Sequence, residues 1–328
     1  MSQLRVSFVV IGRDEAGHLA ESIASCTRQG FDRDEIEIIY VDSGSTDGSS
    51  EIAQAAGVDR ILQLGSAGAS AARARNLGLA NVHAGFVQFV YADTNLAPGW
   101  VTDGIAALKA GPRLAGAEGN LREVRPAANL YHAVCELDWP STPGEVPYVS
   151  GNSLYRVQAI DEAKGFDPRM NLGEEPELGA RLRRMNWRFV HLDRTMGHHD
   201  LDMNGFGDWL RRGYRSGLAC AMVVRATGGW GRGFWHERMS QTLTQGAILV
   251  APWMLAIAAL PFSPISSLAA LALGCLMIAA LAVRKAVSLA REALPLRTRI
   301  AFGFHAYLVK VPSSFGILAA SIRRQPRP

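Results

Sequence analysis

The sequence predicts an α/β fold with a mostly parallel, Rossmann-like sheet, followed by a membrane-associated C-terminal part. Buried-type strands alternate with helices over the first 100 residues, which is the pattern of consecutive βαβ units. In contrast, no Asp, Glu, Lys or Arg occurs between Arg238 and Arg284, although 20% of the chain is charged. These two observations divide the 328 residues into a soluble part and an apolar part.

The predicted elements follow one another in the order that such a sheet requires. Apolar runs rich in Val, Ile and Phe predict buried strands at 6–11, 36–41, 60–64, 86–91 and 187–192. Helical periodicity predicts helices at 16–29, 49–56, 67–80 and 174–185. The segment 146–155 is expected to form one strand, a Gly-Asn turn at 151–152, and a second strand.

The strand at 86–91 is followed at once by Asp93, and the chain turns at Pro98-Gly99. Ligands of an open parallel sheet bind beyond the carboxyl ends of its strands, so Asp93 is expected to face a site. A carboxylate oxygen is a ligand suited to Mg²⁺ or Mn²⁺. A simple turn cap is the alternative for one Asp, but other polar side chains are expected at the same edge. These are Asp14, Glu15, Asp42, Asp47, Arg73, Arg75 and Asn76.

Carboxylates and arginines gathered at the edge of an apolar sheet favour a bound nucleotide. An Asp can accept hydrogen bonds from a base or a ribose, and an Arg can face a base or a phosphate. No G-x-G-x-x-G follows the first strand and no G-x-x-x-x-G-K-[ST] occurs, so a dinucleotide fold and a P-loop are not supported. The net charge of +4 is too small to indicate nucleic acid as a partner.

Several phrases, in this order, resemble the donor half of family 2 glycosyltransferases with the GT-A fold, in their membrane-anchored bacterial form. They are IGRDE, VDSGSTDGS, ARARNLGLA, the strand ending at Asp93, GNSLYR and KGFDPRMNLGEEPELGARLRRMNW. The resemblance covers roughly residues 6–199. It implies transfer of a sugar from a nucleotide-diphosphate donor, usually with inversion, using Mg²⁺ or Mn²⁺.

The resemblance also implies roles for individual residues. Asp93 matches the last Asp of the family's D-x-D metal motif, whereas the first position is Tyr91, a departure that puts metal dependence in question. His198 resembles the His that completes the metal site in some relatives, with a structural role as the alternative. The residues expected to contact the donor are Arg13, Asp14, Glu15, Asp42, Ser43, Arg75, Asn76, Ala92 and Asp93.

The catalytic base that the resemblance implies is Glu175, which follows Glu174 at the start of a predicted helix. Inverting transfer needs a carboxylate that takes the proton of the acceptor hydroxyl. Compensation of the helix dipole is the alternative for these acidic residues and for Glu177. Residues expected near the acceptor or the departing diphosphate are Gly151, Asn152, Arg211, Arg212 and Arg215, although the arginines could instead bind lipid headgroups.

The C-terminal part is predicted to associate with a membrane. The segment 206–235 is rich in aromatic and basic residues, which suits a membrane–water boundary, with an ordinary amphipathic helix as the alternative. The uncharged stretches 243–262 and 265–283 each approach the roughly 20 residues that a spanning helix needs. Flanking cations place both ends in the cytoplasm; they are Arg232, Arg238, Arg284 and Lys285. The apolar segment 300–322 is expected to form a third span or an in-plane helix.

We therefore expect a GT-A domain at 1–203, an interfacial region at 204–238 and a membrane region at 239–328. The expected function is inverting transfer of sugar to a lipid-linked or membrane-proximal glycan acceptor, in cell-surface polysaccharide synthesis at the cytoplasmic face of a bacterial inner membrane. A polyprenyl-phosphate sugar transferase and a non-catalytic nucleotide-sugar-binding scaffold are the alternatives. The four cysteines form no CxxC pair, which favours a reducing cytosol.

Overall fold

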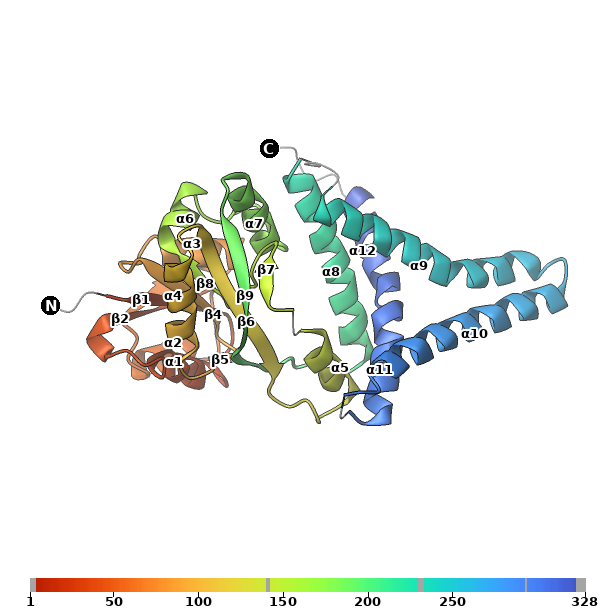
Figure 1. Ribbon diagram of the computed structural model, residues 1–328, viewed down its shortest axis with the longest axis horizontal. Coiled ribbons are helices and arrows are strands. Elements are labelled where there is room, and N and C mark those ends of the chain that lie inside the picture. The colour runs from red at the N-terminus through yellow and green to blue at the C-terminus, as the bar shows by residue number, and fades with distance from the viewer. Residues whose placement is uncertain (1–3, 140–141, 229–232, 293, 323–328) are drawn as a thin grey trace. The chain divides into compact units, whose positions relative to one another are not determined.

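The computed structural model describes residues 4–139, 142–228, 233–292 and 294–322, and it divides into two compact units (Figure 1). The first unit contains the residues up to Val124 together with Trp139–Leu201, and the second contains Arg125–Asp138 and the residues from Asp202 onward. The short stretch 125–138 therefore packs with the C-terminal residues. The three-part functional division expected from the sequence stays a prediction.

The first unit is built on a nine-stranded mixed sheet in the order β3-β2-β1-β4-β8-β6-β9-β5, with β7 paired to β9. The strands are β1 Val6–Gly12, β2 Ile36–Asp42, β3 Arg60–Gln63, β4 Phe86–Tyr91, β5 Thr94–Leu96, β6 Leu114–Glu123, β7 Gly144–Val146, β8 Leu154–Arg156 and β9 Arg188–His199. The first four are parallel, and β8 runs antiparallel to β4. The predicted α/β class with a mostly parallel, Rossmann-like core is confirmed.

Helices cover both faces of this sheet. They are α1 Leu19–Thr27, α2 Ser49–Ala55, α3 Ala71–Leu79, α4 Trp100–Ala110, α6 Val157–Glu162 and α7 Glu174–Arg184, with a short 3₁₀ helix at Arg33–Glu35. Every residue of β2, and all but the last of β1, is buried, which explains their continuous Val, Ile and Phe content. The side chains of the two faces form two separate apolar clusters.

Some predicted boundaries were wrong for identifiable reasons. The first helix begins at Leu19 rather than residue 16, because the backbone N–H groups of residues 14–16 donate to side chains of the loop after β2. The third helix begins at Ala71 because Ser70 caps it, accepting a hydrogen bond from the Arg73 N–H. The last strand continues to His199, and α4 and β6 were not predicted.

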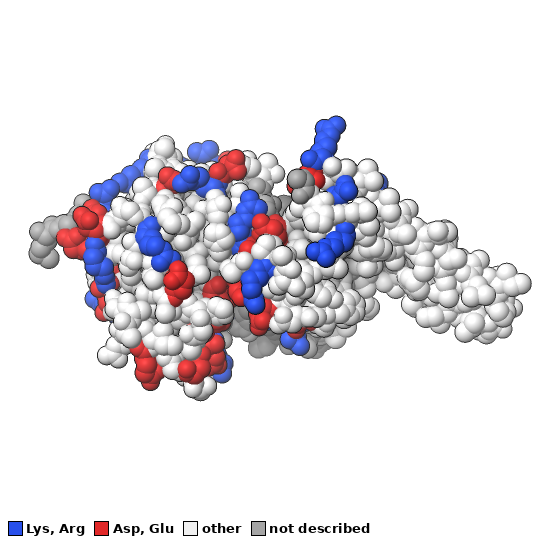
Figure 2. Space-filling model, turned by 90° about the horizontal axis from the view of Figure 1, so that it is seen from below, with Lys and Arg blue, Asp and Glu red and all other residues white. Residues whose placement is uncertain are grey.

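The second unit contains α5 Leu130–Asp138, α8 Phe206–Ala226, α9 Phe234–Ala259, α10 Pro264–Ser288, α11 Leu296–Leu308 and α12 Lys310–Ile322. Helices α9 and α10 are long and apolar enough to cross a membrane, judged on length and composition alone. Figure 2 shows no charged side chain on the part of this helical hairpin that projects at the right of the view. Helix α10 contains the predicted span 265–283, whereas α9 begins before the predicted span 243–262 and ends at Ala259, three residues short of its predicted end. Arg232 lies outside the described residues.

The apolar segment 300–322 forms two helices that meet at Val309. Pro312 explains the break, because it has no N–H to donate to the carbonyl of Leu308, and its ring would clash with that carbonyl in a continuous helix. Each helix has 13 residues, or about 20 Å at 1.5 Å per residue. Neither helix alone reaches the roughly 30 Å of a bilayer core.

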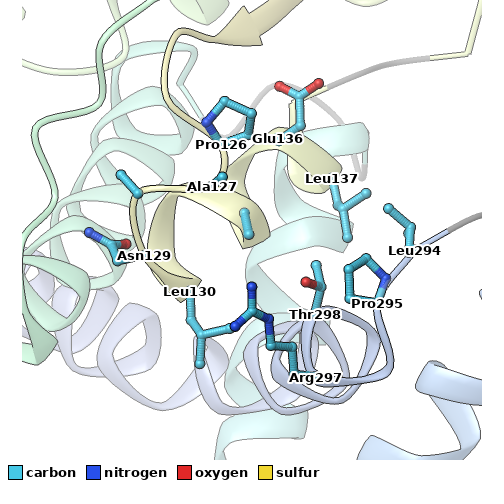
Figure 3. Close-up of a pocket in the computed structure, with 12 residues that line it drawn as sticks. Pro126, Ala127, Asn129, Leu130, Glu136, Leu137, Leu294, Pro295, Arg297 and Thr298 are labelled. Carbon is cyan, nitrogen blue, oxygen red and sulfur yellow. The ribbon is translucent and has the colours of Figure 1, made fainter.

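A pocket of about 380 Å³ lies within the second unit (Figure 3). Its walls come from α5 with the residues before it and from the start of α11, as the labelled side chains in Figure 3 show. Leu130, Leu137, Leu294 and Pro295 make it largely aliphatic, and Arg297 supplies a cation. Its volume lies in the range of small-ligand pockets.

Candidate active site

The carboxyl ends of β1, β2 and β4 carry most of the predicted donor site, and the backbone ties these ends together. The Ser43 N–H donates to the Gly12 carbonyl at 3.0 Å, and the Ala92 N–H donates to the Ile11 carbonyl at 3.0 Å. Gly12 is paired with Asp42 in the parallel register of β1 and β2. The structure therefore brings the loops containing residues 13–15, 42–43 and 92–93 to one edge of the sheet, as expected.

Asp42 is buried and organises the loop that follows it. Its Oδ1 accepts hydrogen bonds from the Ser45 N–H at 3.0 Å and the Ser45 hydroxyl at 2.5 Å, and its Oδ2 accepts from the Ser50 hydroxyl at 3.0 Å. Burial raises the pKa of Asp42, but these hydrogen bonds outweigh burial and leave the pKa below the ordinary value. Asp42 is therefore ionised and rigidly held, and its predicted contact with a base stays a prediction.

The residues after β1 are held by the same loop. Asp14 adopts a left-handed backbone conformation, with φ of 55°, and its Oδ1 accepts a hydrogen bond from the Thr46 N–H at 2.7 Å. The Arg13 side chain is exposed and lies 3.5 Å from Asp14 Oδ2. Burial of Glu15, followed by the nearby charge of Asp93, raises the pKa of Glu15 to about 7. Negative charge is thus concentrated where β1 and β4 end.

Asp93 lies beside a histidine, but the histidine is His199 rather than the predicted His198. His199 Nε2 is 3.4 Å from Asp93 Oδ2, and both side chains are partly exposed. His198 is exposed, and side chains of successive strand residues point to opposite faces, so it is directed away from His199. The Trp139 ring contacts the His199 ring edge-on, with 5.5 Å between centroids.

Arg75, predicted to bind the donor, is instead completely buried between two glutamates and a tyrosine. Its Nη1 donates to Glu174 Oε1 at 2.9 Å, and its Nη2 donates to Glu175 Oε1 at 3.0 Å and to the Tyr91 hydroxyl at 2.7 Å. The rings of Tyr91, Phe166 and Phe89 lie 5.1 to 5.9 Å from the guanidinium carbon. Arg75 therefore positions carboxylates, and a nucleotide cannot reach it in this conformation.

The two glutamates at the start of α7 differ in access to solvent. The Glu174 side chain is 7% exposed, whereas that of Glu175 is 14% exposed, and Glu175 Oε1 also lies 3.4 Å from the Tyr91 hydroxyl. Burial raises the pKa of Glu175, and the Arg75 guanidinium offsets only part of this rise. Glu177 forms an ion pair with Arg181 one turn later, at 2.7 Å. Glu175 is therefore the best placed of the three to act as a proton acceptor.

The remaining predicted residues of the first unit support this cluster. The Asn152 Oδ1 accepts a hydrogen bond from the Tyr91 N–H at 2.7 Å, and its Nδ2 donates to Thr94 Oγ1. Gly151 lies so close to Arg75 and Tyr91 that a Cβ at this position would clash with both side chains. Asn76 makes two hydrogen bonds of 2.8 Å with the backbone of Phe166. These residues are positioned to hold the site together.

The arginines predicted near the acceptor, Arg211, Arg212 and Arg215, are exposed on α8 in the second unit. Two residues of the site were missed at the level of sequence. In the sequence Tyr91 is only a departure from a metal motif, and Gly151, which packs against it, is the one signal of close packing around it. The sequence does not distinguish His199 from His198, because adjacent strand residues differ only in the face that they occupy.

Two family models match the chain: "Glycosyl transferase family 2" over residues 7–130 and "Glycosyl transferase family group 2" over residues 127–283. Together they span residues 7–283. A search of curated proteins found no match.

Solved structures also resemble the chain. One is the mannosyltransferase PcManGT from Pyrobaculum calidifontis in complex with GDP-Man and Mn²⁺, with 18% identity, a TM-score of 0.65, and coverage of 99% of this chain and 89% of that one. Another is residues 1–349 of S. aureus TarS in complex with UDP, with 15% identity, a TM-score of 0.50, and coverage of 94% and 90%. At these identities the likenesses establish the fold.

Proposed function

Because the chain belongs to glycosyltransferase family 2, we propose that this glycosyltransferase moves a sugar, with inversion, from a nucleotide-diphosphate sugar to a lipid-linked or membrane-proximal glycan. The observation that carries the proposal is the placement of Glu175. Its carboxylate is held by buried Arg75 and by Tyr91, the last residue of β4, two positions before Asp93. The end of β4 thus contacts the proposed proton acceptor, Glu175, through Tyr91 and is followed by the metal-ligand candidate Asp93.

In the proposed reaction the acceptor hydroxyl oxygen bonds to the anomeric carbon while the bond from that carbon to the diphosphate oxygen breaks. Glu175 takes the hydroxyl proton, and the nucleoside diphosphate leaves with the bonding electrons. Arg75 and Tyr91 hold one carboxylate oxygen of Glu175, which fixes the direction of the other. The donor class is supported by PcManGT and TarS, whose structures contain GDP-Man and UDP.

The residues around Asp93 fit a divalent cation. Asp93 offers a partly exposed carboxylate, and its charge adds to the effect of burial in raising the pKa of Glu15, so the two carboxyl groups lie close enough to interact. Asp93 would hold Mg²⁺ or Mn²⁺, with His199 as a second ligand candidate. A bound cation would offset the charge of the departing diphosphate. The PcManGT complex with Mn²⁺ supports this assignment.

Asp93→Asn tests the proposal. We expect transfer from a nucleotide-sugar panel that includes GDP-mannose and UDP-GlcNAc to fall by about 10²-fold, because the amide keeps the shape but loses the charge that binds the cation. Transfer is measured with purified protein in detergent across a titration of Mn²⁺. Asp103→Asn, on α4 and paired with Arg194, is the control. Unchanged transfer and unchanged Mn²⁺ dependence in Asp93→Asn would contradict the metal assignment.

The pH dependence of transfer should reveal Glu175. A base must be ionised to accept a proton, and burial raises the pKa of Glu175, so kcat/KM should fall as pH decreases through a pKa above the ordinary glutamate value of 4.5. Tyr91→Phe removes a hydrogen bond to the ionised carboxylate and should move this acid limb to still higher pH. An acid limb at or below 4.5 would be inconsistent with Glu175 as the base.

The membrane part of the proposal rests on the second unit. Arg238 lies near the start of α9, and Arg284 and Lys285 lie near the end of α10, so the positive-inside rule favours a hairpin with both ends in the cytoplasm of a bacterial cell. The exposed face of α11 carries Leu296, Ile300 and Phe304 at helical spacing, which suits an in-plane helix. The largely aliphatic pocket between α5 and the start of α11 supports an acceptor with a lipid chain. One of its walls, at Leu294, lies six residues after the end of α10. An acceptor panel with and without polyprenyl phosphate separates a glycan acceptor from a lipid phosphate acceptor.

A further inference from the structure

The second unit brings cationic side chains from three helices to the start of α12. Gly213 of α8 packs directly against Pro312, and the hydroxyl of Ser314 donates to the Thr242 carbonyl of α9 at 3.0 Å. These contacts hold α8, α9 and α12 together within about one turn of three cations. The cations are Arg212 on α8, Arg238 on α9 and Lys310 on α12.

Lys310 is half-buried without a matching carboxylate. Within the described residues, no hydrogen bond or ion pair within 4.0 Å holds its ammonium group. Burial and then the neighbouring Arg238 charge lower the pKa of Lys310, and Asp138 offsets only part of this. A cation placed near another cation and partly removed from water destabilises the protein by itself. Such an arrangement is typical of a site that binds an anion.

Asp138, the carboxylate whose charge acts on Lys310, also forms an ion-pair contact with His305. The indole N–H of Trp209 donates to His305 Nδ1 at 2.8 Å, so in neutral His305 the proton lies on Nε2. That atom is 3.9 Å from Asp138 Oδ2. The charge of Asp138 therefore acts on His305, Arg212 and Lys310 together, and it offsets only part of what burial and Arg238 do to Lys310.

We propose that Lys310 and Arg238 form a binding site for a phosphate group. A Lys acts as a point charge toward phosphate and an Arg adds a planar fork of donors, so the pair suits the oxygens of a phosphate or diphosphate. Arg238 lies in the first turns of α9, one of the two helices apolar enough to span a membrane. If α9 spans a membrane, Arg238 would lie at the depth of the lipid phosphates, so the ligand is either a lipid headgroup or a free diphosphate.

Lys310→Met tests the site through two effects of opposite sign. In detergent without added lipid, inorganic pyrophosphate should raise the Tm of the wild-type protein, and its affinity for Lys310→Met should be at least about tenfold weaker. The ligand-free variant should unfold at the same temperature as the wild type or above it, because a half-buried charge has been removed. Arg238→Gln should weaken pyrophosphate binding similarly. Arg33→Gln, an exposed cation of the first unit paired with Asp59 at 2.8 Å, is the control and should bind pyrophosphate as the wild type does.

Vesicle binding separates the two sources of phosphate. If the ligand is a headgroup, wild-type protein should prefer vesicles of phosphatidylglycerol and phosphatidylcholine over phosphatidylcholine alone, and Lys310→Met should lose that preference. If the ligand is a free diphosphate, pyrophosphate should bind equally well in neutral nanodiscs. Pyrophosphate and anionic-lipid binding that are both unchanged in Lys310→Met would overturn the proposal. No sugar donor is present, so the result is independent of glycosyl transfer.

Discussion

Glu175→Gln should lower kcat for sugar transfer by about 10²- to 10⁴-fold, the range that general base catalysis contributes. The amide keeps the size of the side chain and can still accept a hydrogen bond from Arg75, but it cannot take the acceptor proton. KM for the nucleotide sugar should change little, since Glu175 faces the acceptor in the proposed reaction. Initial rates at saturating donor and cation measure the effect.

Glu174→Gln is the matched comparison for this experiment. Glu174 accepts a hydrogen bond from the same guanidinium but is more deeply buried, so it acts as a positioning residue and its loss should reduce kcat less than the loss of Glu175. Glu175→Asp keeps the charge on a shorter side chain and should retain activity between those of the wild type and Glu175→Gln. Full turnover by Glu175→Gln would rule out the proposed base.

Arg75→Met should destabilise the first unit by about 3–5 kcal/mol, the usual cost of removing one partner of a buried ion pair. The substitution leaves Glu174 and Glu175 next to each other without a cation, and it leaves the Tyr91 hydroxyl without its donor. Denaturant unfolding in detergent, followed by tryptophan fluorescence, gives the change in the free energy of unfolding.

A second substitution separates this electrostatic explanation from lost packing. Adding Glu174→Gln to Arg75→Met removes one of the two uncompensated charges and should recover part of the lost stability. Arg75→Lys should remain destabilised, because an ammonium group lacks the planar fork that serves three acceptors at once. A loss below about 1 kcal/mol for Arg75→Met, or no recovery in the double variant, would show that the cluster is not held by charge.

The sequence was sufficient for features that depend on local pattern. Continuous runs of Val, Ile and Phe predicted β1, β2 and β4, and the parallel arrangement then brought Asp42 and Asp93 to one edge of the sheet. Helix α4 and strand β6 were missed because Gly104, Gly116 and Gly119 weaken the propensity of both segments. At Gly104 and Gly119 a Cβ would clash with neighbouring atoms, and at Gly116 it would press against Val149 and Leu154, which is a property of tertiary packing.

The differences between the expected and the observed surroundings of the site residues have the same origin. In the sequence, Arg75 resembles a surface cation in an Ala-rich helix. Only the fold shows that it is buried against two glutamates about 100 residues further along the chain. The choice between His198 and His199 depended on the exact register of β9, which residue types do not determine. The burial of Arg75 and the sheet face on which each histidine lies are both determined by partners distant in sequence.

In the proposed enzyme, the hydrogen bond between Arg75 and Tyr91 has a consequence for the binding of cation and donor, which should depend on each other. At this position the family motif has a second acidic ligand, but here the phenol hydroxyl is engaged with the guanidinium. Asp93 then supplies the one carboxylate of that motif, and the remaining ligands of the ion must include water or phosphate oxygens. Each partner strengthens the binding of the other by the same factor, as thermodynamic reciprocity requires. The resting enzyme would thus hold its ion weakly and retain it only while a sugar diphosphate is bound.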